Sequence, residues 1–399
     1  MNLFKSLTQR QEIDDHLNKV RQQSKHRFHD ISLIFDEMLE SKEIVEKYSL
    51  RNSPLAIIGI GGSSLGARVM TQLEGLHSSN IIFFDSLDPS ALSKGMERLE
   101  TDKSTNFLLV SKSGATLESL CIANELISKL NLSKKDISER FLALTSAEKS
   151  PLKSFCSQYD VACYKIPDSI GGRYSIFSKV GLIPYMAAGG TLISNSSLKK
   201  LEMRALESAL KWTNLALTSF DNEKWISLFW TYSDSYLELC KWSQQLWAES
   251  LGKKLNLSGE SAKRSSSPFF CSGTNDQHSI LQQFIEGEDD KLFVFINESA
   301  ETNYTEVKNH FTENSSLDGV SPRKLRDLMF TATSKSLIEA GKDCITIELE
   351  NKMESIFEFC FSLELAVATI ASYHNIDAFN QPGVEASKII TKQLLRSGR

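Results

Sequence analysis

The sequence predicts an α/β fold in which two units each contain a mainly parallel β-sheet between layers of helices. From residue 55 onward, short apolar runs alternate with longer amphipathic runs, which is typical of strands joined by crossover helices. A second series of apolar runs begins at residue 268, after a long stretch with helical periodicity. The 399 residues are enough for two or three domains with large cores.

The first predicted unit spans residues 51–195. It follows a polar segment, residues 1–50, whose helical periodicity predicts helices that lie on a later core. We expect its strands in the apolar runs LAIIGI, IIFFDS, NFLLVS, FLALTS and VACYKI, which begin at residues 55, 81, 106, 141 and 161. Helices are expected between them, near residues 64–75, 89–99 and 116–129.

The second predicted unit spans residues 196–375. Its first part reads mostly as helix to about residue 250. Strands are then expected in PFFCS, KLFVFINE and CITIELE, which begin at residues 268, 291 and 344, with helices near 275–286, 322–340 and 354–373. Residues 376–399 form a loop and a helix that Pro382 begins. Because no low-complexity linker separates the units, we expect them to pack tightly.

Composition excludes several classes of protein. The net charge of −5 argues against general binding to nucleic acid or anionic membranes. The N-terminus lacks the apolar stretch of a signal peptide, and no run approaches the roughly 18 apolar residues of a membrane span, so we expect a cytoplasmic protein. The seven cysteines form no C-x-x-C pair and are expected to be reduced. His26 and His29 lack a suitable third ligand, so we expect solvated helix surface there and no metal site.

Two glycine- and hydroxyl-rich turns follow predicted strands. The first is GIGGSSLG at residues 59–66, and the second is SKSGATLE at residues 111–118. The first turn matches neither the dinucleotide pattern G-x-G-x-x-G nor the Walker pattern, which favours a small phosphate monoester over a nucleotide. Helix N-termini and hydroxyl groups at the carboxyl ends of parallel strands suit such a phosphate. Either turn taken alone is equally consistent with ordinary helix N-caps.

Four further segments are rich in catalytic residue types. Arg173 lies on a loop after two glycines, and Glu249 lies in the last turn of a long helix, whose dipole makes a carboxylate more basic. His278 is expected in the first helical turn of 275–286, where the dipole keeps an imidazole neutral. Lys388 follows Pro382 by about two turns. Spacing alone leaves open that Glu249 and Lys388 are simply exposed surface residues.

Together these segments resemble the phosphoglucose isomerase family over roughly residues 55–390. GGRYSIFSKVGLIP, at 171–184, and FNQPGVEASK, at 379–388, are similar to the two signatures of the family. GIGGSSLG, SKSGATLE, ESLGK and GTNDQHS occur in the family order. The chain departs from many members at Leu251, where Asn is common, and at Asp276, where Gly is common.

The resemblance implies two sugar-isomerase (SIS) domains, a homodimer with shared active sites, and no cofactor or metal. It implies an aldose–ketose isomerase of glycolysis and gluconeogenesis that interconverts glucose 6-phosphate and fructose 6-phosphate through a cis-enediol. Glu249 would move the proton, Arg173 would stabilise the enediolate, and His278 and Lys388 would assist ring opening. The residues implied at the sugar phosphate are Gly62, Ser63, Ser111, Lys112, Ser113, Thr116 and Gln381. The alternatives are another SIS-type phosphosugar isomerase, acting on mannose or amino-sugar phosphates, and a non-catalytic sugar-phosphate sensor.

Overall fold

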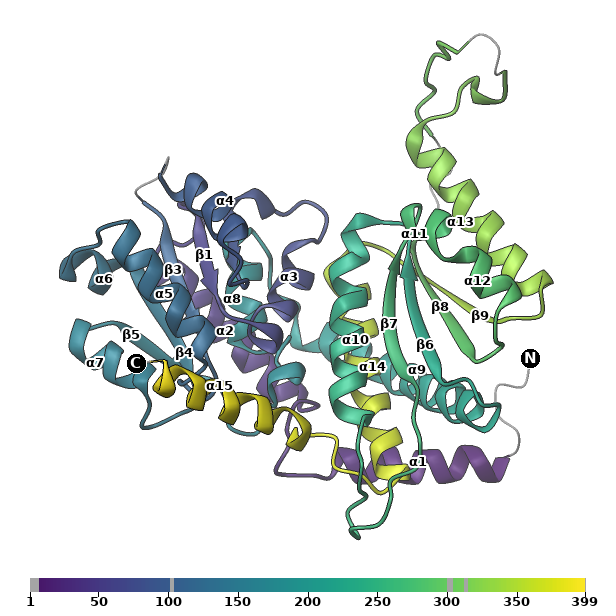
Figure 1. Cartoon of the computed structure of the whole chain (residues 1–399), viewed down its shortest axis with the longest axis horizontal. Coiled ribbons are helices and arrows are strands. Elements are labelled where there is room, and N and C mark those ends of the chain that lie inside the picture. Colours follow the sequence, from purple (N-terminus) through teal and green to yellow (C-terminus); the bar gives the residue numbers. More distant parts are fainter. Residues whose placement is uncertain (1–6, 101–103, 300–303, 312–314, 399) are drawn as a thin grey trace.

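Two parallel β-sheets form the framework of the molecule (Figure 1). The computed structural model describes residues 7–100, 104–299, 304–311 and 315–398. The first sheet has the strand order β2-β1-β3-β4-β5 and the second has the order β7-β6-β8-β9. The strands are β1 (Leu55–Ile58), β2 (Ile81–Phe84), β3 (Asn106–Val110), β4 (Phe141–Thr145), β5 (Ala162–Lys165), β6 (Ile226–Thr231), β7 (Ser267–Ser272), β8 (Lys291–Glu298) and β9 (Asp343–Leu349). The predicted α/β class with parallel sheets is confirmed.

Helices cover both faces of each sheet. One face of the first sheet packs on α2, α3 and α8, and the other on α4 to α7. One face of the second sheet packs on α9, α10 and α14, and the other on α12 and α13. The helices are α1 (Leu7–Arg21), α2 (Ile31–Lys47), α3 (Leu65–Thr71), α4 (Pro89–Glu100), α5 (Leu117–Lys129), α6 (Lys134–Arg140), α7 (Pro151–Tyr159), α8 (Lys179–Ala187), α9 (Asn195–Asp221), α10 (Leu237–Leu251), α11 (Asn275–Ser279), α12 (Leu281–Glu286), α13 (Pro322–Glu339), α14 (Met353–Tyr373) and α15 (Glu385–Ser397).

One continuous core joins the two sheets. In β1, Leu55 and Ile57 point into this core, whereas Ala56 and Ile58 point into the core under α4 to α7. This alternation is what a strand buried on both faces requires. The shared core also contains α9, α10 and α14, so apolar side chains from both units pack against one another without an intervening linker. The position of α10 between the sheets is therefore fixed by packing.

The prediction of secondary structure was wrong in three places. β6, the strand between β7 and β8, lies inside the stretch that was predicted to be mostly helical. Helices α6, α7 and α8 were not predicted. His26 and His29 lie between α1 and α2 in a non-helical segment, and both are half-buried, so they are not solvated helix surface.

Helix α14 also corrects the expectation that no segment resembles a membrane span. By length and composition, Met353–Tyr373 is apolar enough to cross a membrane, with a mean hydropathy of 1.5 in its most apolar window. In the folded chain, 83% of that window is buried. The helix packs mainly against α9, α1 and α10. Its apolar character is that of a core helix.

A carboxyl group is buried in this helix. Glu364 is fully inaccessible, and neither of its carboxyl oxygens has a hydrogen-bond partner within the described part of the chain. Burial raises the pKa of Glu364 well above its ordinary value of 4.5. The folded chain therefore keeps a proton on Glu364 at a pH where the unfolded chain has released it, and stability falls as the pH rises above this ordinary value.

We expect Glu364→Gln to be more stable than the parent protein at pH 8, because Gln is neutral at every pH and has a similar shape. The difference should widen between pH 5 and pH 8, because in this range Glu364 is ionised in the unfolded parent chain and protonated in the folded one, so each further pH unit disfavours folding of the parent. Urea unfolding at several pH values measures it. Glu354→Gln, on the exposed side of the same helix, is the control and should track the parent. A constant difference between Glu364→Gln and the parent at all pH values would contradict the buried neutral carboxyl.

Candidate active site

The two hydroxyl turns follow neighbouring strands of the first sheet. β1 and β3 lie side by side, and the strand order changes direction between them. In open parallel sheets, ligands bind in the crevice at the carboxyl ends of strands where neighbouring connections diverge in this way. The sequence places GIGGSSLG after β1 and SKSGATLE after β3. Both turns therefore line the crevice in which this topology favours ligand binding.

The first turn packs closely against the loop that carries Arg173. A side chain at Gly62 would place a Cβ 2.6 Å from the carbonyl carbon of Gly172, so only glycine allows this approach. The hydroxyl of Ser175 donates a hydrogen bond to the carbonyl oxygen of Gly62 at 3.1 Å. Ser63 ends the short 3-10 turn Gly61–Ser63 and is half-buried. These contacts join the predicted phosphate turn to the Arg173 loop.

The second turn presents only some of its predicted groups to solvent. Ser111 is buried, and its hydroxyl lies 2.8 Å from that of Thr116, the residue that precedes α5. Ser113 is exposed beside Gly114, whose φ of +64° favours glycine. The ammonium group of Lys112 donates to the carbonyl oxygen of Ile170 at 2.6 Å, and burial lowers the pKa of Lys112. Ser111 and Lys112 thus shape the turn, while Ser113 and Thr116 are the more accessible hydroxyls.

Glu249 lies in the last turn of α10, held by two amide groups. Gln245 Nε2 donates to one carboxylate oxygen at 3.0 Å, and Gln381 Nε2 donates to the other. Arg173 Nη1 lies 3.4 Å from that second oxygen. The Glu249 side chain is 27% exposed. A carboxylate that is oriented by three donors and still reaches solvent can accept a proton from a ligand.

The guanidinium of Arg173 is almost completely buried. Its Nε donates to the hydroxyl of Ser250 at 2.7 Å, and its Nη2 donates to the carbonyl oxygens of Ala378 and Asn380. The Tyr174 hydroxyl lies 3.1 Å from the same Ser250 hydroxyl, and burial raises the pKa of Tyr174 to about 12. Backbone carbonyls from the C-terminal loop therefore compensate a buried positive charge, which fixes the loop next to Glu249.

His278 and Lys388 are not brought to this cluster within one chain. His278 follows β7 and is exposed. Lys388 is exposed on α15, where its ammonium group lies 2.8 Å from the carboxylate of Glu385. Figure 1 shows α11 at the upper end of the second sheet and α15 along the lower side of the first unit.

The predicted helix 275–286 is interrupted, which changes the reasoning about His278. It consists of α11 and α12, and His278 lies in the last turn of the five-residue α11, not in the first turn of a long helix. The apolar residues that follow pack on the core of the second unit, with Phe284 buried and Ile280, Leu281 and Ile285 partly buried. Intrachain packing accounts for these residues, so they carry no argument for a subunit interface.

Two contacts at the site were not anticipated. Gln245 precedes Glu249 by one helical turn, so the i, i+4 spacing could have suggested that its side chain meets the carboxylate. His26 stacks on Phe379 with 3.7 Å between ring centroids, although 353 positions separate the two residues and no local pattern indicates the contact. Within the described ranges, no group of three or more His, Cys, Asp or Glu side chains is placed to bind a metal ion.

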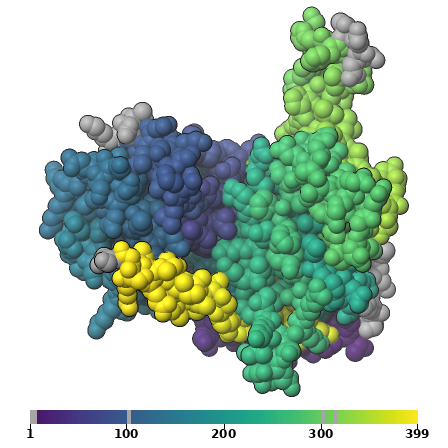
Figure 2. Space-filling view, in the orientation of Figure 1, coloured from purple at the N-terminus to yellow at the C-terminus, as the bar shows by residue number. Residues whose placement is uncertain are grey.

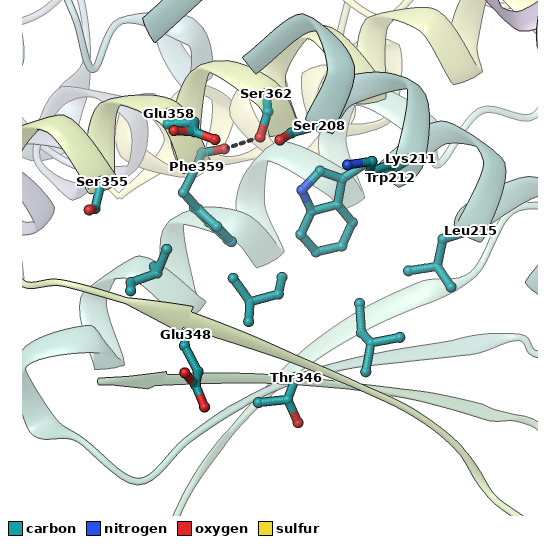
Figure 3. A pocket seen from close by; sticks show the side chains of 13 residues that line it. Ser208, Lys211, Trp212, Leu215, Thr346, Glu348, Ser355, Glu358, Phe359 and Ser362 are labelled. Carbon is teal, nitrogen blue, oxygen red and sulfur yellow. Dashed lines mark hydrogen bonds between the residues drawn. The ribbon is translucent and has the colours of Figure 1, made fainter. Parts of the chain in front are cut away.

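A separate cavity of about 460 Å³ lies between α9, α14 and β9. Trp212, Leu215 and Phe359 line it from the helices, with Thr346 and Glu348 on the strand side (Figure 3). Its walls contain none of the residues predicted at the site. The candidate active site is therefore the cluster around Glu249, not this cavity.

Comparison with known proteins gives a consistent assignment. Residues 35–317 match the family described as phosphoglucose isomerase. A glucose-6-phosphate isomerase of Carboxydothermus hydrogenoformans is 29% identical over 381 residues, which cover 89% of this chain and 80% of that protein. A hypothetical protein of Thermus thermophilus has a similar structure, with a TM-score of 0.83 and 25% identity over 96% of this chain and 94% of that chain. For a glucose-6-phosphate isomerase of Chlamydia trachomatis the TM-score is 0.71, with 23% identity over 90% and 73% of the two chains.

Proposed function

The chain belongs to the phosphoglucose isomerase family, and from this membership we infer that it is an aldose–ketose isomerase that interconverts glucose 6-phosphate and fructose 6-phosphate. Its two α/β units have the SIS-type architecture. The observation that best supports the site is the convergence of Arg173, Glu249 and Gln381 beside the turn that contains Gly62.

We propose that Glu249 carries the proton in this reaction. A C–H bond next to a carbonyl is a weak acid, so a positioned base and a partner for the developing oxyanion are both needed. In the open-chain aldose, Glu249 takes the proton from C2 while O1 gains a proton, which gives the cis-enediol. Glu249 then returns its proton to C1 while the O2 hydroxyl loses one, so the net reaction moves one proton from C2 to C1 and one from O2 to O1. The Nη1 of Arg173 is next to the Glu249 carboxylate, where its charge supports negative charge on the enediolate oxygens.

The activity is tested by a coupled assay for conversion of fructose 6-phosphate to glucose 6-phosphate. Proton transfer predicts in addition that solvent deuterium enters C1 or C2 of the sugar during turnover. Mannose 6-phosphate and glucosamine 6-phosphate, assayed in parallel, separate this activity from the alternatives, which the comparisons do not favour. Absence of turnover and of deuterium uptake with the glucose and fructose phosphates would refute the assignment.

We propose that the 6-phosphate binds between the two hydroxyl turns, with Ser63, Ser113 and Thr116 as direct donors. Ser111 supports Thr116 through the hydrogen bond between their hydroxyls. Lys112 holds the adjacent loop through the carbonyl oxygens of Asp168 and Ile170, so it contributes positive charge without being free to move. No metal or cofactor takes part in this proposal.

The double variant Ser113→Ala, Thr116→Val should bind substrate much more weakly. Each lost hydrogen bond to a charged group costs roughly 1.5 to 3 kcal/mol, so KM should rise at least ~100-fold, with a smaller change in kcat. Steady-state kinetics with fructose 6-phosphate measure both constants. Ser157→Ala, an exposed position on α7, serves as the control and should retain the parent KM. An unchanged KM in the double variant would remove these hydroxyls from the phosphate site.

We further propose a homodimer in which His278 acts in the site of the other subunit. His278 follows the carboxyl end of β7, whereas Glu249 lies in the last turn of α10, which begins after the carboxyl end of β6. Glu249 lies twelve residues after Leu237, the first residue of α10, which is about 18 Å along the helix from the edge of the sheet where the strands end. The two side chains therefore lie at opposite ends of the second unit. If His278 assists ring opening, a second copy must supply it.

The C-terminal helix gives the dimer proposal a second line of support. On α15, Ile389, Ile390, Leu394 and Leu395 are each more than half exposed. Figure 2 shows the helix uncovered on this face of the molecule. An amphipathic helix with an uncovered apolar side is typical of a protein interaction surface. Contact of this side with the second copy would also bring Lys388 into a protein environment, which its predicted role in ring opening requires.

We propose domain limits at residues 1–50, 51–195, 196–375 and 376–399, and a cytoplasmic location. Residues 376–399 contact the first unit at the site, where Arg173 donates to the carbonyl oxygens of Ala378 and Asn380. Limited proteolysis with mass spectrometry would locate the domain boundaries.

A further inference from the structure

Lys253 makes two contacts at the site that link separate parts of the chain. It follows Gly252, the C-cap of α10, and its side chain is half-buried. Its ammonium group donates to the carbonyl oxygen of Glu249 at 2.6 Å and to the carbonyl oxygen of Asn380 at 2.7 Å. The two acceptors are 131 positions apart in the sequence. One side chain therefore joins the end of the base-carrying helix to the C-terminal loop.

Both acceptors lie close to the groups that orient the Glu249 carboxylate. The last carbonyl groups of a helix lack partners in the helix, and a cation is a favourable partner for them at the negative end of the dipole. Asn380 precedes Gln381, whose amide donates to the Glu249 carboxylate. Lys253 thus holds the backbone of Glu249 and the backbone next to Gln381 at the same time.

We propose that Lys253 is a positioning residue of the isomerase: it holds the C-terminal loop against the end of α10, and thereby keeps Gln381 on the carboxylate of Glu249. The inference rests on the proposed catalytic role of Glu249 and adds a residue to it. Arg173 holds the same loop through Ala378 and Asn380, but from a buried position. Lys253, in contrast, holds the loop from a position that solvent can reach.

The charge of Lys253 depends on pH within the working range of most enzymes. Burial, followed by the positive charge of Arg173, lowers the pKa of Lys253 to about 8, against the opposing effect of Asp377 and Glu249. The ammonium form therefore predominates below about pH 8 and the neutral amine above it. Hydrogen bonds from a charged donor are about twice as strong as those from a neutral one. The hydrogen bonds from Lys253 to the carbonyl oxygens of Glu249 and Asn380 therefore weaken as the pH rises through this value.

The test uses Lys253→Met, which removes both hydrogen bonds, and Lys253→Arg, which keeps a positive charge at every pH. With Lys253→Met, we expect kcat to fall about tenfold at pH 7, with KM changed less than threefold because the phosphate turns are untouched. The parent protein should lose kcat/KM above pH 8. In Lys253→Arg this decline should move up by at least one pH unit. Lys254→Met, at the exposed neighbouring position, is the matched control and should keep the parent profile.

Hydrogen exchange provides a readout that does not depend on turnover. Amide protons of residues 376–384 should exchange faster in Lys253→Met than in the parent and in Lys254→Met. If Lys253→Met fails to fold, the pH profile of Lys253→Arg alone decides. The proposal is overturned if kcat/KM of Lys253→Arg declines at the same alkaline pH as that of the parent. It is also overturned if a folded Lys253→Met keeps the parent kcat and the parent rate of amide exchange in residues 376–384. If the proposal fails in either way, isomerase activity of the parent protein still supports the proposed function.

Discussion

Glu249→Gln lowers kcat at least ~100-fold while the enzyme still binds sugar phosphate, because Gln keeps the shape of Glu but cannot accept the proton. In the variant, the amide oxygen can keep Gln381 and Arg173 as donors. Gln245, whose Oε1 has no partner in the described structure, can turn its amide over and accept from the new NH2 group, so the variant side chain keeps its place. Turnover is measured with the coupled assay, and binding by competitive inhibition with inorganic phosphate in the residual reaction. Incorporation of solvent deuterium into the sugar should fall in parallel with kcat.

The control for this variant is Glu238→Gln, at the other end of α10. Glu238 forms an ion pair with Lys241 at 3.0 Å and has no contact with the Arg173 loop in the described structure. Removing its charge therefore tests the effect of a carboxylate on the same helix without touching the proposed base. Near-normal turnover by Glu249→Gln would assign proton transfer to another group.

A heterodimer of Glu249→Gln and His278→Ala chains regains activity, although each homodimer is nearly inactive. In a two-fold dimer with shared sites, one site carries both substitutions and the other carries neither. Co-expression of the two chains with different affinity tags allows the heterodimer to be purified. It has one intact site of two, so its activity should be about half that of the parent dimer.

The heterodimer has two controls. A heterodimer made from two differently tagged Glu249→Gln chains should stay inactive, which excludes an effect of the tags. Sedimentation must show that the parent protein is dimeric under assay conditions. If His278 instead serves its own chain, each site keeps one substitution. A purified, dimeric and inactive heterodimer would therefore contradict the shared site.

The framework was largely predictable from the sequence because strands and helices alternate regularly. β6 is the instructive exception. Its run, ISLFWT, is buried along nearly its whole length and lies between two long helices, so it lacks the alternation that marks a half-buried strand. A short apolar run of this kind cannot be distinguished from buried helix by periodicity. Its place between β7 and β8 is a consequence of tertiary packing.

The candidate site was predictable in part, and mainly through the resemblance. Local patterns identified the turns after β1 and β3 and placed Glu249 at a helix end. They carry no information on which distant residues meet it, and Gln381 contacts Glu249 across 132 positions. The stacking of His26 on Phe379 and the buried carboxyl of Glu364 also depend on packing between distant segments. The proposed meeting of His278 with Glu249 would depend on a second chain, which the pattern of one sequence does not describe.

Because Arg173 donates to carbonyl groups of Ala378 and Asn380, the order in which the protein folds during synthesis is also constrained. A chain that grows from its N-terminus on the ribosome contains Arg173 long before Ala378 and Asn380 are synthesised. Until then the guanidinium lacks the acceptors that compensate its burial, so the Arg173 loop cannot close in its final form. The nascent chain can complete the first sheet early, but the proposed catalytic centre forms only once residues 378–380 are available. A chain that stops shortly before residue 378 would therefore contain both sheets but lack the acceptors that the Arg173 loop needs.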